Sequence, residues 1–295
     1  MPFMQQRTGA LLVLASAVAF GVMPVFGKLS FEAGVGVATL LFVRFAIATP
    51  VLWATVLVRR ALPRDRGPVL RALALGAVGY AMQAGLYFLA LERMDASVLS
   101  LVLYSYPALV TGAAILLRRE SASPRRLVAL LTASGGLVLV LAGAGVGSLD
   151  LAGCAFGAGA ALTYTTYILV SDGVTKALDP LPLAALVSTG AMVTLGTVAA
   201  AMGALDFGFD PVGWVWLGLA ALVSTVAAVV LFFSGMSRVG PSTAAILSTL
   251  EPPVTVALVF VTFGEALGAL QLFGALAVMS AAVIVNLPAR RMATA

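Results

Sequence analysis

Ten apolar runs follow one another along the chain, with short polar stretches between them. A helix that crosses a bilayer needs about 20 mostly apolar residues. By that measure the expected spans are 9–28, 35–58, 68–90, 96–117, 126–146, 151–171, 180–202, 212–234, 241–263 and 268–288. The intervals between the runs leave no room for a soluble domain. The pattern therefore predicts an all-α, polytopic membrane protein with ten transmembrane helices.

The composition supports this interpretation and narrows the possible chemistry. Of the 295 residues, 61% are hydrophobic and only 10% are charged, which is too apolar for a soluble protein of this size. The chain has one cysteine, Cys154, so no intrachain disulfide can form, and it has no histidine, the commonest metal ligand and general base. We expect no metal and no cofactor. The first apolar run is interpreted as a retained helix, because no soluble domain follows it.

The basic residues are distributed unevenly between the two sides of the predicted membrane. With the N-terminus inside, 14 of the 17 Lys and Arg residues lie on the inner side, Lys28 and Arg93 lie on the outer side, and Arg44 lies within a span. Positive charge collects on the cytoplasmic side of membrane proteins. We therefore expect a multi-pass protein of the inner (plasma) membrane with both termini in the cytoplasm. The net charge of +5 is explained without a nucleic-acid partner.

The chain also repeats itself. A shift of 145 residues aligns residues 84–141 with the second half without a gap, and pairs Arg93 with Arg238, Ser97 with Ser242, Pro107 with Pro252 and Glu120 with Glu265. We interpret this as a duplication, with units of five spans each at 1–148 and 149–295. Because five is odd, the second unit enters the membrane from the opposite side. Inverted repeats are typical of secondary transporters, which bind substrate near the midplane.

Two charged residues lie near the middle of predicted spans, Arg44 in the second and Glu251 in the ninth. Such residues are costly in lipid and face the protein interior or water. They either pair with each other and set the packing between the halves, or one of them meets a charged substrate or a proton. A purely structural polar pair is the third alternative.

Pro24, Pro107 and Pro252 each lie inside a predicted span. A proline inside a helix frees a carbonyl and kinks the helix, and in lipid that carbonyl needs protein or a wet cavity. Ser248 lies in the turn that Pro252 frees. Prolines at equivalent places in both halves favour a cavity over simple packing kinks, and gating or kinking is their expected role.

Tyrosines gather in three spans and are candidates for the wall of a pocket. Tyr80, Gln83 and Tyr87 share one helix face, although Tyr87 also fits an interfacial belt. The other candidates are Tyr104 and Tyr106, just before Pro107, and Tyr164 and Tyr167 in the sixth span. Apolar walls with hydroxyl tips suit a small, partly apolar solute.

Three segments of the chain are distinctive: "RFAIA" at 44–48, "YSYPALVTGAAILLRRE" at 104–120 and "LEPPVTVALVFVTFGE" at 250–265. With them the chain resembles the drug/metabolite transporter superfamily, in its ten-helix branch with two EamA-type repeats. The resemblance implies export of amino acids or other small metabolites. The aromatic amino acid exporters of this superfamily carry aromatic residues just before the fourth-span proline and in the sixth span. Tyrosines stand here where tryptophans are expected, so the substrate stays open.

Together these observations predict a secondary transporter, not an enzyme, that exports a small metabolite by alternating access. We expect an amino acid, aromatic or hydrophobic, as the substrate; another metabolite or a drug is the alternative. An intramembrane lipid-modifying enzyme and a channel are rivals from other classes, but the acidic residues are dispersed rather than clustered as an enzyme would need. The expected partners are the substrate and the lipid bilayer. Glycine-rich stretches suit close helix packing, so we expect a monomer or a weak homodimer.

Overall fold

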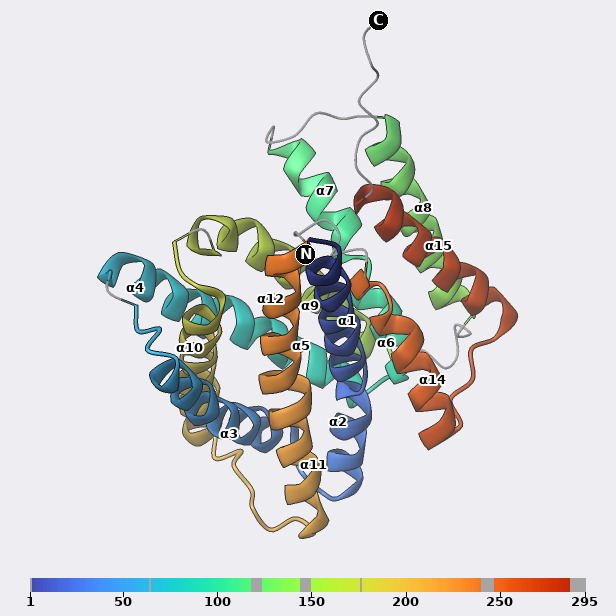
Figure 1. The fold of residues 1–295 in the computed structure, drawn as a ribbon. Helices are drawn as coiled ribbons and strands as arrows, with labels where there is room; N and C mark the ends of the chain where they lie inside the picture. The colour runs from blue at the N-terminus through green and yellow to red at the C-terminus, as the bar shows by residue number, and fades with distance from the viewer. Residues whose placement is uncertain are drawn as a thin grey trace, which may run out of the picture.

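All regular secondary structure in the described part of the chain is helical. The computed structural model describes residues 2–63, 65–117, 124–143, 150–175, 177–239 and 247–286 (Figure 1). The first half contains α1 (Pro2–Gly21), α2 (Met23–Glu32), α3 (Val37–Val58), α4 (Arg66–Ala74), η1 (Leu75–Tyr80), α5 (Ala81–Leu91), α6 (Ala96–Leu103), α7 (Tyr106–Leu116) and α8 (Pro124–Gly143). The second half contains α9 (Leu151–Thr175), α10 (Pro180–Ala201), α11 (Val212–Ala221), η2 (Leu222–Ala227), α12 (Ala228–Val239), α14 (Glu251–Phe263) and α15 (Ala269–Asn286).

Within the described residues, six helices or series of consecutive helices are long and apolar enough to cross a membrane. They are Gln6–Glu32, Val37–Val58, Arg66–Leu91, Leu151–Val170, Pro180–Ala201 and Val212–Met236. Four shorter apolar helices occupy the remaining expected spans, at Ala96–Val110, Leu127–Val140, Glu251–Phe263 and Ala269–Ala281. The predicted membrane protein is thus all-helical, while the count of ten spans in two inverted repeats stays a prediction. The first helix begins at Pro2, earlier than expected, because the helix also includes the polar residues that precede the apolar run.

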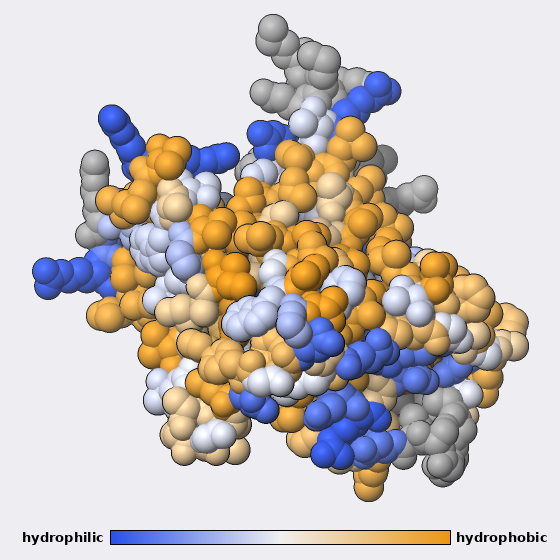
Figure 2. Space-filling model, turned by 90° about the horizontal axis from the view of Figure 1, so that it is seen from below, coloured by the Kyte–Doolittle hydropathy of each residue, from blue (hydrophilic) through white to orange (hydrophobic). Residues whose placement is uncertain are grey.

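The surface of the molecule fits a bilayer rather than water. Many large apolar side chains are exposed, among them Val58 at 83%, Val261 at 80% and Leu131 at 72%. Hydrophobic residues cover much of the face in Figure 2, and hydrophilic residues gather in separate patches. The surface of a soluble protein rarely carries large contiguous apolar patches. The chain is therefore a multi-pass membrane protein.

Three helices begin directly after a break, and each has a proline at its second position. The prolines are Pro24 in α2, Pro107 in α7 and Pro252 in α14. Proline is well tolerated in the first turn of a helix, where its missing N–H has no intrahelical partner to lose. The first and fourth expected spans are consequently built from two helical segments each, and in the ninth α14 begins after a break.

The break in the first span lies against the start of α14. The Thr255 hydroxyl donates a hydrogen bond of 2.9 Å to the Gly21 carbonyl. A Cβ added to Gly21 would lie 3.0 Å from the carbonyl oxygen of Glu251. The contact supplies a partner to a carbonyl at the end of α1, as a break in lipid requires.

Two π-helical segments interrupt long helices, one in each half. η1 lies between α4 and α5, and η2 lies between α11 and α12. Single π turns within α-helices often occur at functional sites. Both segments contribute a side chain to the site described below.

Glycines allow the closest helix contacts within the chain. A Cβ on Gly76 of η1 would lie 2.0 Å from the carbonyl oxygen of Val187 in α10, and one on Gly190 would lie 2.2 Å from that of Leu73. α8 and α15 lie side by side in Figure 1, and a Cβ on Gly136 would come within 2.8 Å of the Gly274 carbonyl. The glycine-rich face of α8 is thus used for packing inside one chain.

Candidate functional site

Five of the six tyrosines form a continuous row of rings through the molecule. The ring centroids lie 5.6 Å apart for Tyr104 and Tyr106, 4.7 Å for Tyr106 and Tyr164, 6.1 Å for Tyr164 and Tyr167, and 6.0 Å for Tyr167 and Tyr80. These separations are typical of stacked and edge-to-face aromatic pairs. We call these five residues the tyrosine row. It draws three members from the first half of the chain and two from the second.

Glu251 lies at one end of the tyrosine row. The Tyr104 hydroxyl lies 2.6 Å from the Ser248 carbonyl oxygen and 3.0 Å from Oε2 of Glu251. A tyrosine hydroxyl carries a single hydrogen, so two acceptors share it here. A proton on Glu251 would add a second donor to this cluster, and the contact is therefore suited to proton exchange.

Arg44 lies at the other end of the row and is 2% exposed. Its Nε donates to the Thr225 hydroxyl at 2.7 Å, and its Nη2 lies 3.4 Å from the Tyr80 hydroxyl. The guanidinium also lies over the rings of Phe45 and Phe88, with 4.9 and 5.6 Å to the ring centroids. The site thus runs from a carboxyl group to a guanidinium along five tyrosine rings.

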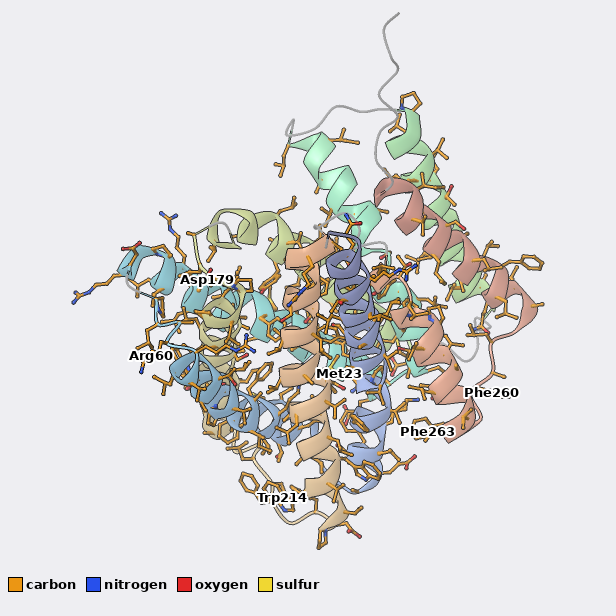
Figure 3. The ribbon with its side chains drawn as sticks, viewed as in Figure 1. Met23, Arg60, Asp179, Trp214, Phe260 and Phe263 are labelled. Atoms are coloured by element: carbon orange, nitrogen blue, oxygen red, sulfur yellow. The ribbon has the colours of Figure 1, made fainter. Side chains whose placement is uncertain are left out.

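Arg44 and Glu251 do not form an ion pair with each other. Within the described residues, the ion pairs are Lys28 with Glu265 and Arg93 with Asp150. The first joins α2 to the segment after α14, and Lys28 also lies 5.7 Å from the ring centroid of Phe263, which Figure 3 labels at the end of α14. Of the alternatives that the sequence left open, direct pairing of Arg44 with Glu251 is therefore absent from this structure.

The other predicted site residues lie around the row rather than in it. Gln83 is half-buried on α5, and Tyr87 is buried with its ring edge-on to Phe88 at 5.4 Å. Ser248 takes part through its backbone carbonyl, not its side chain. The side chain of Pro107 lies outside the described part of the structure.

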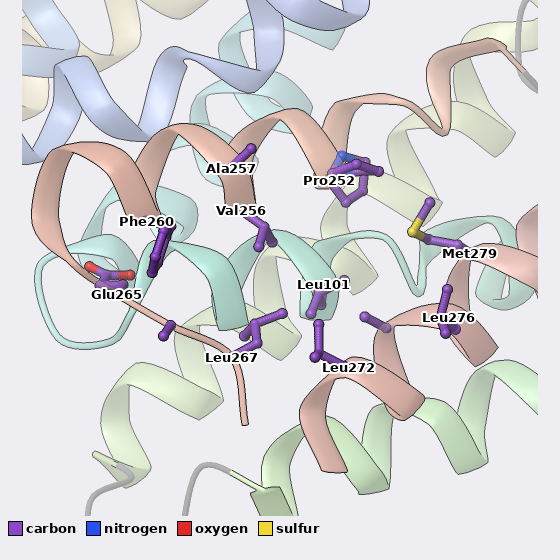
Figure 4. A pocket seen from close by; sticks show the side chains of 13 residues that line it. Leu101, Pro252, Val256, Ala257, Phe260, Glu265, Leu267, Leu272, Leu276 and Met279 are labelled. Atoms are coloured by element: carbon purple, nitrogen blue, oxygen red, sulfur yellow. The ribbon is translucent and has the colours of Figure 1, made fainter. Parts of the chain in front are cut away.

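Two cavities of the described structure lie beside the row and not on it. The larger, of about 490 Å³, lies between α6, α14 and α15 (Figure 4), and the smaller, of about 220 Å³, lies between α6, α7, α8 and α9. Apolar side chains line most of both cavities, and no tyrosine lines either one. The rings of the row instead pack against each other, with neighbouring centroids 4.7–6.1 Å apart. No group of three metal-ligating side chains occurs within the described residues.

The two halves of the chain each match the same family model. The EamA-like transporter family matches residues 7–142 and again 151–287. The chain belongs to the EamA-like transporter family. The family model describes transporters, so this EamA-like protein is a membrane transporter of small solutes. The boundary between the predicted units, at residues 148 and 149, stays a prediction.

Individual relatives agree with this assignment. This EamA-like transporter is 27% identical over 280 residues to "Uncharacterized transporter YcbK" of Bacillus subtilis (strain 168), covering 92% of this chain and 90% of that protein. A solved crystal structure superposes with a TM-score of 0.66 at 18% identity, covering 94% of this chain and 96% of that one. At that identity the structural likeness shows a shared fold and nothing about substrate.

Among the contacts of the candidate site that sequence reasoning missed in this EamA-like transporter is the one between Arg44 and Thr225. Thr225 lies in η2, and its hydroxyl also donates to the Ala220 carbonyl at 3.0 Å. A signal was present just before the aligned stretch 84–141, because the same shift of 145 residues pairs Tyr80 with Thr225. In the predicted repeat, the two hydroxyl partners of Arg44 are therefore equivalent positions.

Proposed function

We propose that this EamA-like transporter is a secondary transporter that exports an amino acid with an aromatic or hydrophobic side chain. The observation that carries the proposal is the tyrosine row, which runs between Glu251 and Arg44. Tyrosine rings offer apolar surface to a side chain, and their hydroxyls offer hydrogen bonds to polar groups. A solute that is apolar at one end and charged at the other matches such a wall.

Alternating access is the mechanism that we propose. The row contains residues from both predicted units, 1–148 and 149–295, so any movement of one unit against the other rearranges it. The breaks before Pro24, Pro107 and Pro252 provide places where a span can bend. Rocking of inverted repeats about a midplane site is a common transport mechanism.

We further propose that the protein works in the inner membrane as a monomer or weak homodimer, with both termini in the cytoplasm. The distribution of Lys and Arg supports the orientation. The use of Gly136 and Gly274 for packing within one chain supports the monomer, because the closest glycine contact between α8 and α15 is already satisfied.

The test of the tyrosine row replaces three of its members with alanine. The triple variant Tyr104→Ala, Tyr106→Ala and Tyr164→Ala should weaken the apparent affinity for L-phenylalanine by about tenfold or more. Each aromatic pair contributes about 0.5–1.5 kcal/mol to the binding free energy beyond the contribution of its buried area. The measurement is uptake into proteoliposomes at varied substrate concentration. Phe260→Ala is the matched control, because this aromatic residue of α14 is 56% exposed and lies outside the row. An unchanged affinity in the triple variant would place the substrate elsewhere.

A further inference from the structure

Arg44 is a buried cation without a negatively charged partner. It is the eighth residue of the 22-residue helix α3, about 10 Å from the start of that helix at 1.5 Å per residue. Its side chain contacts two hydroxyl groups and two apolar rings, and no carboxylate of the described residues pairs with it. A buried charge is normally paired. Contacts with neutral rings offset only part of its desolvation.

The two hydroxyl contacts hold the guanidinium without using its whole donor set. The Thr225 hydroxyl gives its own hydrogen to the Ala220 carbonyl, so its oxygen accepts from Nε of Arg44 at 2.7 Å. The 3.4 Å contact of Nη2 with Tyr80 is long for a hydrogen bond. A guanidinium has five N–H donors, and the remaining ones have no hydrogen-bond partner within the described residues. The fork formed by Nη1 and Nη2 is the part left for a ligand.

We propose that Arg44 is the subsite for the carboxylate of the transported molecule, held by this fork. Arginine binds carboxylates with two parallel hydrogen bonds. Arg44 is the one basic residue of the sequence near the middle of a predicted span, so a singly charged anion balances it better than a phosphate dianion does. The proposal rests on the proposed export of an amino acid and names the chemical group that the site selects.

The surroundings of Arg44 fix the order of the substrate's parts. The ring of Tyr80 lies edge-on to Phe45 at 5.5 Å and leads through Tyr167 into the tyrosine row. A carboxylate on Arg44 would replace the weak Tyr80 contact, and the apolar side chain of the substrate would then lie along the rings. Because Arg44 contacts both Thr225 of η2 and Tyr80 of η1, carboxylate binding acts on a side chain that lies between the π-helical segments of the two halves.

The test compares three probes that share a phenyl ring and differ in their charged groups. They are L-phenylalanine, its decarboxylated form 2-phenylethylamine, and its deaminated form 3-phenylpropionate. Binding is measured as the shift of the thermal unfolding midpoint of the purified full-length chain at varied probe concentration. The two carboxylates should bind to the unmodified protein and the amine should not. Arg44→Gln should weaken both carboxylates by at least about tenfold, as loss of a buried charge partner does.

Two further variants separate a binding role from a structural one. Arg44→Lys keeps the charge but not the fork and should retain weakened carboxylate binding. Thr225→Val keeps the shape of the threonine, removes the acceptor that orients Nε, and should weaken only the carboxylates. If Arg44→Gln does not fold, these two variants decide the question. Arg93→Gln is the matched control, since Arg93 pairs with Asp150 at an exposed position, and it should keep the original pattern.

The outcomes distinguish this inference from the proposed function. The carboxylate subsite would be overturned if Arg44→Gln weakened the binding of every probe equally. It would also be overturned if 2-phenylethylamine bound to the unmodified protein as tightly as L-phenylalanine does. Counterflow of L-phenylalanine in proteoliposomes with an unchanged preference in Arg44→Gln would overturn the subsite and leave the proposed function standing. Carboxylate binding that depends on Arg44, without any counterflow of L-phenylalanine, would support the subsite and contradict the proposed substrate.

Discussion

At the scale of single residues, the candidate site is a row of tyrosine rings between the carboxyl group of Glu251 and the guanidinium of Arg44. The sequence identified Arg44 and Glu251 as candidates because an ionisable residue inside an apolar run is conspicuous. It did not predict their partners, since Thr225 is 181 positions from Arg44 and Tyr104 is 147 positions from Glu251. Contacts at such separations depend on how the helices cross, which periodicity within one helix does not encode. The part played by the Ser248 carbonyl was hidden for the same reason.

Glu251→Gln should flatten the pH dependence of transport. The Glu251 carboxyl and the Ser248 carbonyl share the single hydrogen of the Tyr104 hydroxyl. A proton gained or lost by Glu251 therefore changes the number of hydrogen-bond donors in this cluster. The amide of glutamine keeps the same donors at every pH. The measurement is the initial rate of L-phenylalanine uptake between about pH 5 and 8, the range in which perturbed acidic groups titrate. Glu92→Gln, at an exposed position, is the control. Full transport with an unchanged pH profile in Glu251→Gln would remove Glu251 from the substrate path.

At the scale of elements, the apolar runs and the prolines indicated where helices lie and where they break. Nothing in the sequence indicated the two π-helical segments. Each proline that was expected to interrupt a span stands at the second position of a helix after a break. The π turns at η1 and η2 leave no such mark, because a π turn and an α turn are built from the same apolar residues. Their location depends on packing, as the approach of Gly76 to Val187 in α10 shows.

Gly76→Ala should destabilise the protein by about 1–3 kcal/mol, the usual cost of overpacking a close contact. The added Cβ would lie 2.0 Å from a backbone oxygen, so η1 and α10 would have to separate. The measurement is the thermal unfolding midpoint of the purified protein. Gly85→Ala lies in the same long helix with nothing within 4 Å of its added Cβ, and it should leave the midpoint unchanged or slightly higher. Equal midpoints for the two variants would contradict the packing described for η1.

At the scale of the whole molecule, the family match and the tyrosine row describe two halves that meet at one site. The family model matches each half once, and the row, the partners of Arg44 and the ion pair of Lys28 with Glu265 all join one half to the other. Such contacts couple the relative position of the halves to whatever occupies the site. The inverted arrangement of the two units stays a prediction, which rests on the odd number of predicted spans in each unit and on the distribution of basic residues.

The predicted orientation is tested by labelling single cysteines. In a Cys154→Ala background, Asp95→Cys should react with a membrane-impermeant maleimide added to intact cells, because the predicted third and fourth spans are joined outside. Asp65→Cys should react only after the cells are permeabilised, because Asp65 lies between the predicted second and third spans, on the side rich in arginine. The opposite labelling pattern would reverse the proposed topology.

Counterflow in proteoliposomes tests the central claim, that this EamA-like transporter is a carrier for an aromatic amino acid. Vesicles loaded with unlabelled L-phenylalanine are diluted into a trace of labelled L-phenylalanine, with empty vesicles and vesicles of the triple tyrosine-to-alanine variant as controls. A carrier that alternates between two faces should accumulate label transiently above its equilibrium level, and the triple variant should lose most of this overshoot. Entry of label to equilibrium without an overshoot would indicate a channel, and no entry at all would contradict the proposed substrate.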